Sequence, residues 1–526
     1  MPAKSRSKNK NIRIYCLLGS IFLLFSLIVW RLFFIQIKEH DFYKALANDQ
    51  GRSFDSRISY RGEIKTIDNY TLAVNKKWPM VYAVPKKVIN PEETAKQLAE
   101  LLEMDEETIF KRLDKLNDPY EPLKQKISDE TSSKIQELNL NGIAIDYQWT
   151  RYYPGQNMAA QLIGFVSQEG GQYGLEKYYE ENLAQGEDLV LTIDYTIQFF
   201  VEQKIKELRE AFNAKAGSAI IMDPKTGAII ALVNYPDFNP NSYSDTENIN
   251  LFLNPAVNYI FEPGSVFKPI TMASALDSKK ITPQTTYYDA GEKVIGNYTI
   301  HNWDGQAYGR QTMTQVLEKS LNTGAIFAGE QAGKEIFLQY VRDFGFGLPT
   351  GIGLPGESKG DISNLSIKSD INYATASYGQ GISVTPLQLI TALSAIANNG
   401  KLMQPYIIAS QKPQIIRQVI SPQTSWQLTE MLKSVFKSGN LQNFQVQGYE
   451  IAGKTGTAQV PEKGGYSQDK SIHTLVGYAP ADNPAFIVLL KLDEPIGARW
   501  SAVSLPPTFH EILKFLLNYY QIPPSK

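Results

Sequence analysis

The chain has 526 residues, of which 43% are apolar and 20% are charged, and its formal net charge at pH 7 is −2. This length exceeds one ordinary domain of about 100–200 residues, so we expect two or three domains. The composition excludes a largely disordered chain, and the near-neutral charge argues against nucleic acid as a partner.

The first predicted element is a membrane-spanning helix. An apolar stretch begins at Ile14 and continues to Ile37, and five basic residues precede it: Lys4, Arg6, Lys8, Lys10 and Arg13. A spanning helix needs roughly 17–25 mostly apolar residues. No small-residue cleavage site follows, which favours an uncleaved anchor over a signal peptide. The basic flank predicts a cytoplasmic tail over 1–13, an anchor in the cytoplasmic membrane over 14–37 and an extracytoplasmic remainder.

Residues 38–190 form the next predicted domain. Short strand-like runs, such as 80–84, alternate there with charged helical stretches, such as 92–116. This region contains no cluster of nucleophiles, bases or metal ligands, so we predict a non-catalytic domain.

Residues 191–526 have the pattern of a mixed α/β domain. A helix is predicted over 195–212, and two apolar runs within 217–233 flank Asp223-Pro-Lys-Thr-Gly227, which predicts a β-hairpin. A helix-rich middle follows, then strands over 450–454, 473–478 and 485–492 and a helix over 507–520. Strands at both ends with helices between them indicate a mixed α/β fold.

Metal-binding residue types are few. Cys16 is the only cysteine and lies in the apolar anchor, which excludes an internal disulfide or a cysteine metal cluster. The four histidines are scattered, at positions 40, 301, 473 and 510, and His510-Glu511 is not completed to a two-histidine zinc motif. We predict no metal and no cofactor.

Three short motifs occur in serine enzymes that attack β-lactams and D-alanyl peptides: Ser-x-x-Lys, Ser-x-Asn and Lys-Thr-Gly. Each occurs here more than once. Ser-x-x-Lys begins at positions 5, 7, 265, 434 and 467, Ser-x-Asn at 7, 320 and 438, and Lys-Thr-Gly at 225 and 454. Residues 265–268 and 434–437 have the same four letters, Ser-Val-Phe-Lys. Only the context of each copy can identify the functional one.

Ser265 has the context of a nucleophile. Pro263-Gly264 breaks the chain before it, an apolar helix follows, and Pro269 suits the first turn of that helix. Lys268 is nearly one turn further on, so its amine can lie beside the hydroxyl. Ser434, in contrast, lies in the middle of a predicted helix with no breaker before it.

A lysine can activate a serine only if its pKa falls, through burial or a nearby positive charge. Lys454 can supply that charge. Lys454-Thr455-Gly456-Thr457 follows a short strand pattern, and Gly456 would allow a substrate backbone to approach closely. The lysine and the two threonine hydroxyls suit a substrate carboxylate. The other Lys-Thr-Gly is the predicted hairpin turn.

The motifs and their order resemble those of class B penicillin-binding proteins. The matching segments include Phe261-Glu-Pro-Gly-Ser-Val-Phe-Lys-Pro269, Ser320-Leu-Asn-Thr-Gly324, Ala374-Thr-Ala-Ser-Tyr-Gly-Gln-Gly-Ile-Ser-Val-Thr-Pro-Leu-Gln388, Lys454-Thr-Gly-Thr-Ala-Gln459 and Val476-Gly-Tyr-Ala-Pro-Ala-Asp482. Arg61-Gly62, Arg151-Tyr-Tyr-Pro154 and Gly174-Leu-Glu176 resemble the N-terminal module of that family. The resemblance covers nearly the whole chain after the anchor.

The resemblance implies a fold and a reaction. The expected fold is an antiparallel sheet flanked by helices with a helical subdomain over 191–526, and an elongated α+β pedestal of the dimerisation type over 38–190. The implied activity is that of a peptidoglycan D,D-transpeptidase. Ser265 would be acylated by D-Ala-D-Ala stem peptides or by β-lactams.

The resemblance also implies roles for the other residues. Lys268 would be the general base, Ser320 would relay a proton to the leaving group, and Asn322 would bind the substrate amide. Lys454, Thr455 and Thr457 would hold the terminal carboxylate, and the backbone N–H groups of Ser265 and Thr457 would form the oxyanion hole. The middle motif reads Ser-Leu-Asn where many β-lactamases have Ser-Asp-Asn. For Asn322 a helix-cap or turn role is the alternative.

Within the family, the motifs resemble the division branch (FtsI-like) more than the elongation branch. That branch implies a polytopic SEDS-type glycan polymerase (FtsW-like) and other division proteins as partners. The alternatives are an elongation-specific transpeptidase, a D,D-carboxypeptidase or β-lactamase-like hydrolase, and a non-catalytic division scaffold. After the second motif, where a deacylating β-lactamase often carries its glutamate, no clear Glu-x-x-Leu-Asn signature occurs, although Glu357 is present.

Overall fold

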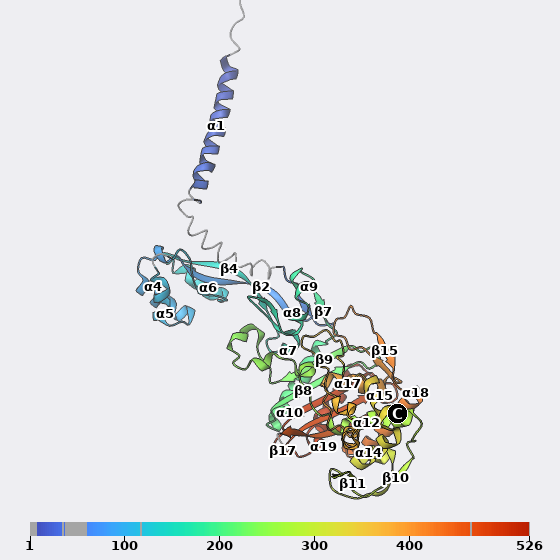
Figure 1. Cartoon of the computed structure of the whole chain (residues 1–526). Helices are drawn as coiled ribbons and strands as arrows, with labels where there is room; N and C mark the ends of the chain where they lie inside the picture. Colours follow the sequence, from blue (N-terminus) through green and yellow to red (C-terminus); the bar gives the residue numbers. More distant parts are fainter. Residues whose placement is uncertain (1–7, 34–35, 37–59, 116–117, 463–464, 525–526) are drawn as a thin grey trace, which may run out of the picture. The chain divides into compact units, whose positions relative to one another are not determined.

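The computed structural model describes residues 8–33, 36, 60–115, 118–462 and 465–524 (Figure 1). It contains two compact units. The smaller unit comprises residues 1–61 and 75–151, and the larger unit comprises residues 62–74 and 152–526. The domain limits that we placed at 190/191 stay a prediction.

Helix α1 (Lys8–Phe33) contains residues 14–33 of the predicted anchor. Its segment Tyr15–Phe33 has 19 residues and a mean hydropathy of 2.2, which by length and composition is enough to cross a membrane. The large apolar side chains of this segment are exposed. Residues 1–7 of the predicted tail, residues 34, 35 and 37 of the anchor and residues 38–59 of the pedestal lie outside the described residues.

The rest of the smaller unit is an α+β module. Strand β2 (Thr71–Ala83), which belongs to this unit from residue 75 onward, pairs with β3 (Glu121–Lys124) and with β4 (Ile143–Tyr152), which belongs to it up to residue 151. The helices are α4 (Pro91–Leu102), α5 (Glu106–Leu113) and α6 (Asp129–Glu137). The helix that we expected over 92–116 is divided within its described part. Glu103 adopts the left-handed conformation at the end of α4, and the Asp105 carboxylate caps α5 by accepting from Thr108 N.

The larger unit is built on a five-stranded antiparallel sheet with the order β16-β17-β18-β8-β9. The strands are β8 (Ala216–Met222), β9 (Ile229–Tyr235), β16 (Ala452–Glu462), β17 (Gly465–Ala479) and β18 (Phe486–Asp493). The hairpin predicted around residues 223–227 is confirmed. Figure 1 shows β8 and β9 in green and β17 in red, and because β18 pairs with both β17 and β8, strands from both ends of the unit form one sheet.

Helices cover this sheet. Helix α10 (Tyr195–Ala211) packs on β8 and β9 and contacts α20 (Pro506–Tyr519), while α17 (Pro386–Ala397) packs on β8 and β18 and α18 (Pro422–Lys437) packs on β16. Every residue of α17 is buried, and β18 is buried at all but its last residue. The expected mixed α/β fold, with an antiparallel sheet flanked by helices, is therefore confirmed.

A helical subdomain lies between the two halves of the sheet sequence. It contains the 3-10 turn η5 (Gly264–Phe267) and the helices α12 (Lys268–Asp277), α13 (Met313–Lys319), α14 (Asn322–Ala332), α15 (Lys334–Asp343) and α16 (Asp370–Ser377). Helix α12 packs on α14 and α15. Two small antiparallel strand pairs lie between α12 and α13: β10 (Thr286–Asp289) with β13 (Gly309–Thr312), and the hairpin of β11 (Glu292–Ile295) and β12 (Tyr298–His301).

The remaining elements of the described chain are short. They are β1 (Ile64–Lys65), η2 (Pro85–Lys87), α7 (Ala160–Ile163), β5 (Phe165–Ser167), β6 (Gly170–Gln172), α8 (Gly174–Tyr178), α9 (Glu180–Ala184), β7 (Leu189–Val190), η3 (Pro240–Asp245), η4 (Ile249–Phe252), α11 (Pro255–Asn258), η6 (Ser363–Ser366), β14 (Lys401–Met403), β15 (Ile415–Gln418), η7 (Gln442–Phe444) and α19 (Ser501–Ser504).

Candidate active site

Ser265 lies in the 3-10 turn η5, which leads directly into α12. Gly264 has a φ of 58°, a value that favours glycine, and its N–H donates to Gly379 O at 2.9 Å. Pro269 lies in the first turn of α12, as expected. The half-buried Ser265 therefore stands where the chain turns into a buried helix, and it lines a pocket.

Lys268 is fully buried at the start of α12. Its Nζ lies 2.6 Å from Ser320 O, 2.9 Å from Asn322 Oδ1 and 3.2 Å from Ser320 Oγ. Burial, and secondarily the charge of Lys454, lower the pKa of Lys268 well below its ordinary value. No hydrogen bond joins Ser265 to this amine among the described residues, and such bonds are often long before substrate binds.

Lys454 comes from β16 and is equally buried. Its Nζ donates to Ser320 Oγ and to Thr455 O, both at 3.0 Å. Burial lowers the pKa of Lys454 to about 7. The Ser320 hydroxyl thus lies within hydrogen-bonding distance of both amines. The charge of Lys454 lowers the pKa of Lys268 further, which favours Lys268 as the base.

Ser320 and Asn322 lie at the junction of two helices. Ser320 ends α13 in the left-handed conformation (φ 58°), and α14 begins at Asn322. The Asn322 side chain does not cap α14, because the N-cap residue is Leu321. Its Nδ2 donates instead to His301 O at 3.0 Å, while its Oδ1 accepts from Lys268. The alternative that Asn322 is a capping residue is therefore not what is observed.

Gly456 brings strand β16 against the turn that carries Ser265. A Cβ at this position would lie 2.9 Å from both Pro263 O and Val266 N. We expected the glycine to make room for a substrate backbone, but the nearest neighbour is the chain itself. The absence of a side chain at position 456 is what lets the strand and the turn of Ser265 approach each other.

The two threonines of this strand have different surroundings. Thr457 lines the pocket, and its Oγ1 donates to Ser501 Oγ at 3.0 Å and accepts from Ser501 N at 2.9 Å. Thr455 is buried and accepts from Asn440 Nδ2 at 3.3 Å. Of the two, only Thr457 has its hydroxyl at the pocket among the lining residues described.

The pocket beside Ser265 has a volume of about 430 Å³. Asn322 and Thr457 also line it, together with residues that carried no motif. Two of these, Trp303 and Trp500, face each other with ring centroids 5.1 Å apart at an interplanar angle of 75°. No sequence pattern indicated that these tryptophans belong to the site, because they are separated by nearly 200 residues and meet only in the folded chain. Among the described residues no group of acidic, histidine or cysteine side chains could hold a metal ion.

The family of the chain follows from its sequence. The model of the penicillin binding protein transpeptidase domain matches residues 217–514, and that of the penicillin-binding protein dimerisation domain matches residues 57–190. The chain belongs to the class B penicillin-binding proteins, in the FtsI branch.

Individual relatives agree with this. The penicillin-binding protein is 32% identical to stage V sporulation protein D of Bacillus subtilis, over 99% of this chain and 88% of that one. It is 30% identical to the probable peptidoglycan D,D-transpeptidase PbpC of Pseudomonas aeruginosa, over 99% and 97% of the two chains. Among solved structures, penicillin binding protein 3 from Mycobacterium tuberculosis, complexed with aztreonam, has a TM-score of 0.71 and 27% identity, with 89% and 97% of the chains covered.

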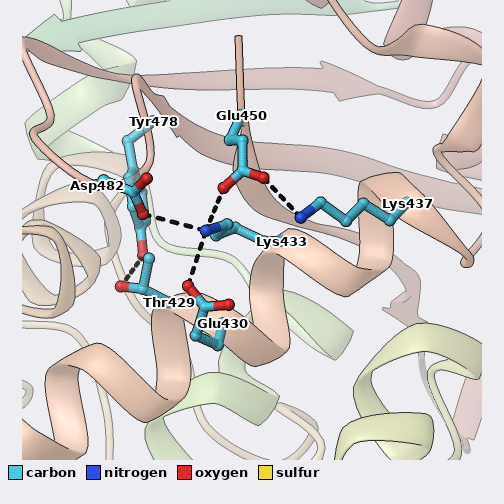
Figure 2. Close-up of polar contacts among 7 residues, drawn as sticks. All are labelled: Thr429, Glu430, Lys433, Lys437, Glu450, Tyr478 and Asp482. Carbon is cyan, nitrogen blue, oxygen red and sulfur yellow. Dashed lines mark hydrogen bonds and ion pairs between the residues drawn. The ribbon is translucent and has the colours of Figure 1, made fainter. Parts of the chain in front are cut away.

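The second Ser-Val-Phe-Lys of this penicillin-binding protein has none of the features of the first. Ser434 lies within α18 and donates to Met431 O at 2.6 Å, a bond inside its own helix. Lys437 is half exposed and forms an ion pair with Glu450 at 2.6 Å (Figure 2). The Lys-Thr-Gly at residues 225–227 is also bonded away from the site. Lys225 Nζ donates to Asn483 Oδ1, and the Thr226 hydroxyl donates to Asp223.

Proposed function

We propose that this transpeptidase cross-links peptidoglycan through an acyl-enzyme at Ser265, formed from the D-Ala-D-Ala end of a stem peptide. The observation that carries the proposal is the position of Lys268. Its fully buried amine is bonded to Ser320 and Asn322, and Lys268 lies three residues after Ser265, which lines the pocket. Burial and the charge of Lys454 lower the pKa of Lys268 well below its ordinary value, which favours the neutral amine that can accept a proton.

The reaction has two steps. In the first, the Ser265 proton passes to Lys268, the serine oxygen bonds to the carbonyl carbon of the penultimate D-alanine, and the bond to the terminal D-alanine breaks. Ser320, in contact with both amines, relays a proton to the leaving nitrogen. In the second step an acceptor amine attacks the ester, forms the cross-link and returns the proton to Ser265.

The other predicted residues serve binding in this proposal. Lys454 and Thr457 hold the terminal carboxylate of the donor peptide, and the backbone N–H groups of Ser265 and Thr457 stabilise the oxyanion. The close approach of β16 to the turn of Ser265 at Gly456 supports this pairing of donors. Thr455 is buried behind the strand, so its contribution is to position Lys454 and Asn440 rather than to bind the carboxylate.

Hydrolysis, as in a D,D-carboxypeptidase or a β-lactamase, is the alternative fate of the acyl-enzyme. Glu357, the acid that the sequence left open as a water-activating base, accepts hydrogen bonds from Thr350 N at 2.7 Å and Gly351 N at 3.0 Å. It is not among the residues that line the pocket. This supports an acyl-enzyme that waits for an amine.

We propose a role in septal wall synthesis, which the names of an FtsI homologue from Mesostigma viride and of stage V sporulation protein D support. The chain would be held in the cytoplasmic membrane by α1 with its N-terminus inside, as the basic flank predicts. An FtsW-like glycan polymerase would be its partner. In this proposal the pedestal occupies residues 38–190 and the transpeptidase domain residues 191–526.

The septal role is tested by depletion of the protein. Depletion should block septation and give filaments, whereas rounded cells would indicate an elongation enzyme.

Penicillin labelling of the full chain tests the chemistry. We expect wild type and the matched control Ser434→Ala to bind fluorescent penicillin equally, Ser265→Ala to bind none, and mass spectrometry to find the adduct on Ser265. Equal labelling of Ser265→Ala would refute the assignment. Rescue of septation by Ser265→Ala would favour a non-catalytic scaffold, and rapid multiple turnover of nitrocefin would favour a hydrolase.

A further inference from the structure

Helix α14 begins without a capping residue of its own. The first N–H groups of a helix lack partners within it, and serine, threonine, aspartate or asparagine at the N-cap usually supplies one. Here the middle motif places Leu321 at the N-cap, where no side chain can accept a hydrogen bond. The cap comes from another element: Asn302 Oδ1 accepts from Asn322 N at 3.0 Å and from Thr323 N at 3.4 Å.

A buried carboxylate holds the other end of that amide. Asp289, at the end of β10, is fully buried, and Asn302 Nδ2 donates to both of its oxygens, at 3.1 and 3.0 Å. The carboxylate also accepts from Thr323 Oγ1 at 2.6 Å, Tyr308 N at 3.0 Å and Gly291 N at 3.2 Å. Because a carboxylate only accepts and helix N–H groups only donate, the orientation of the Asn302 amide is determined.

This network reaches the proposed base through Asn322. The backbone of Asn322 is held by Asn302, its Nδ2 by His301 O, and its Oδ1 accepts from Lys268 Nζ at 2.9 Å. A neutral lysine amine has two N–H groups and one lone pair. With the N–H groups directed to Asn322 Oδ1 and Ser320 O, the lone pair is left to face the Ser320 hydroxyl, whose oxygen lies 3.2 Å from Nζ.

We propose that Asp289 and Asn302 are positioning residues for acylation: they hold the start of α14 so that Asn322 fixes the orientation of the Lys268 amine. The proposal rests on the proposed role of Lys268 as the base. Burying a carboxylate costs stability unless its hydrogen bonds are complete, and well-packed apolar residues are often at least as stable in such places. Asp289 has all these hydrogen bonds and is connected through Asn302 to the backbone of Asn322. Its burial therefore points to a need to fix the orientation of Asn322 at the start of α14.

The test reverses the hydrogen-bond directions and then restores them. In Asp289→Asn, a donor amide faces Asn302 Nδ2, so Asn302 loses an acceptor or turns its own amine on the helix N–H groups. In Asn302→Asp, two carboxylates meet. The double variant D289N/N302D restores the bonds between the two side chains and at the helix start, because the new amide donates to the new carboxylate and that carboxylate caps α14. It leaves one of the N–H groups of Gly291 and Tyr308 facing an amide nitrogen, and Gln306 O loses its donor.

The measurement is the second-order rate constant for acylation of the full-length protein by penicillin, as a function of pH, together with the Tm. We expect each single variant to lose about 10- to 100-fold in rate and the swap to recover part of that loss at pH values above its acid limb. The acid limb of its profile should move to higher pH, because the negative charge is one group closer to Lys268. The groups that contact Lys268 or act on its charge, namely Ser320, Asn322 and Lys454, are unchanged.

The control is Gln198→Leu, which removes a buried amide bonded to the backbone of Leu232 in the sheet. It should lower the Tm and leave the rate and its pH profile unchanged. Wild-type rates and profiles in both folded single variants would overturn the proposal. A swap that folds with the wild-type Tm and remains as slow as the single variants would also overturn it. Labelling of Ser265→Ala would instead refute the proposed function.

Discussion

Residues 265–268 and 434–437 have the same sequence, Ser-Val-Phe-Lys, but different structures. The first begins in a 3-10 turn after a glycine with positive φ and enters a buried helix. The second lies at the end of α18, with its serine bonded inside the helix and its lysine half exposed. Four residues therefore do not make a nucleophile. The conformation before the serine and the surroundings of the lysine do.

The lysines of the two regions differ in their partners. Lys268 and Lys454 are bonded to hydroxyl, amide and carbonyl oxygens, and burial lowers the pKa of both. Lys433, one turn before Lys437, is also buried but contacts the carboxylates of Glu430, Glu450 and Asp482 (Figure 2). Burial alone would lower the pKa of Lys433, and those carboxylates outweigh it and raise the pKa. A buried lysine with neutral partners has a lowered pKa and can act as a base, whereas a buried lysine with carboxylate partners stays charged and forms a structural ion pair.

The largest effect should separate the two copies of the motif. Replacing Lys268 by Met removes the proposed base, and we expect the rate of acylation by penicillin to fall by about 10³-fold or more, as for other members of a nucleophile–base unit. Lys437→Met is the matched control and should leave the rate within about twofold, since it removes only a half-exposed ion pair. Stopped-flow acylation measures both. A similar loss in the two variants would remove the distinction between the regions.

The pH dependence of acylation should follow the two buried amines. As the pH falls through the lowered pKa of Lys268, the base becomes protonated and the rate should drop by about tenfold per pH unit. The pKa of Lys454 is about 7. As the pH rises above this value, Lys454 loses the charge that would lie beside the substrate carboxylate, and the rate should drop again. Lys454→Arg keeps its charge and should lose the alkaline limb alone. An alkaline limb that survives in this variant would assign that limb to another group.

The smallest effects concern stability, and they should have opposite signs. Lys454 has a pKa of about 7 when folded and 10.5 otherwise, so the unfolded chain binds more protons between these values. Its burial therefore costs stability at pH 7, and the cost shrinks as the pH rises toward 10.5. Lys454→Met should raise the free energy of unfolding at pH 7 by about 2 kcal/mol, after the loss of its hydrogen bonds.

Lys433→Met should act in the other direction. The raised pKa of Lys433 means that its contribution is fully present below pH 10.5 and is lost above it. We expect a loss of about 2 kcal/mol at pH 7, because three carboxylates lose their common partner. Thermal unfolding at pH 7 measures the pair. Equal signs for the two variants would contradict the contrast drawn here, and a change in acylation by Lys433→Met would contradict its structural role.

Local signals predicted most of the fold. The helices at α10 and α20 followed from apolar spacing, and the hairpin of β8 and β9 from Pro and Gly in its turn. The helix over 92–116 was predicted wrongly as one piece, because the left-handed Glu103 that divides it carries no glycine signal. At the site, the motifs supplied Ser265 and Lys268, whereas Trp303, Trp500 and the pair Asp289 and Asn302 carried no motif.

The sequence by itself determined the family, the order of the motifs and the chemical types at the site, since these depend on residue identity and short-range spacing. Tertiary structure alone decided which of two identical tetrapeptides is buried and which of two Lys-Thr-Gly segments faces a serine. It also decided that helix α14, whose N-cap residue Leu321 cannot accept a hydrogen bond, is capped by the Asn302 side chain. The physical reason is that a lysine pKa and a hydrogen-bond direction depend on atoms brought together from distant parts of the chain, which local sequence does not specify.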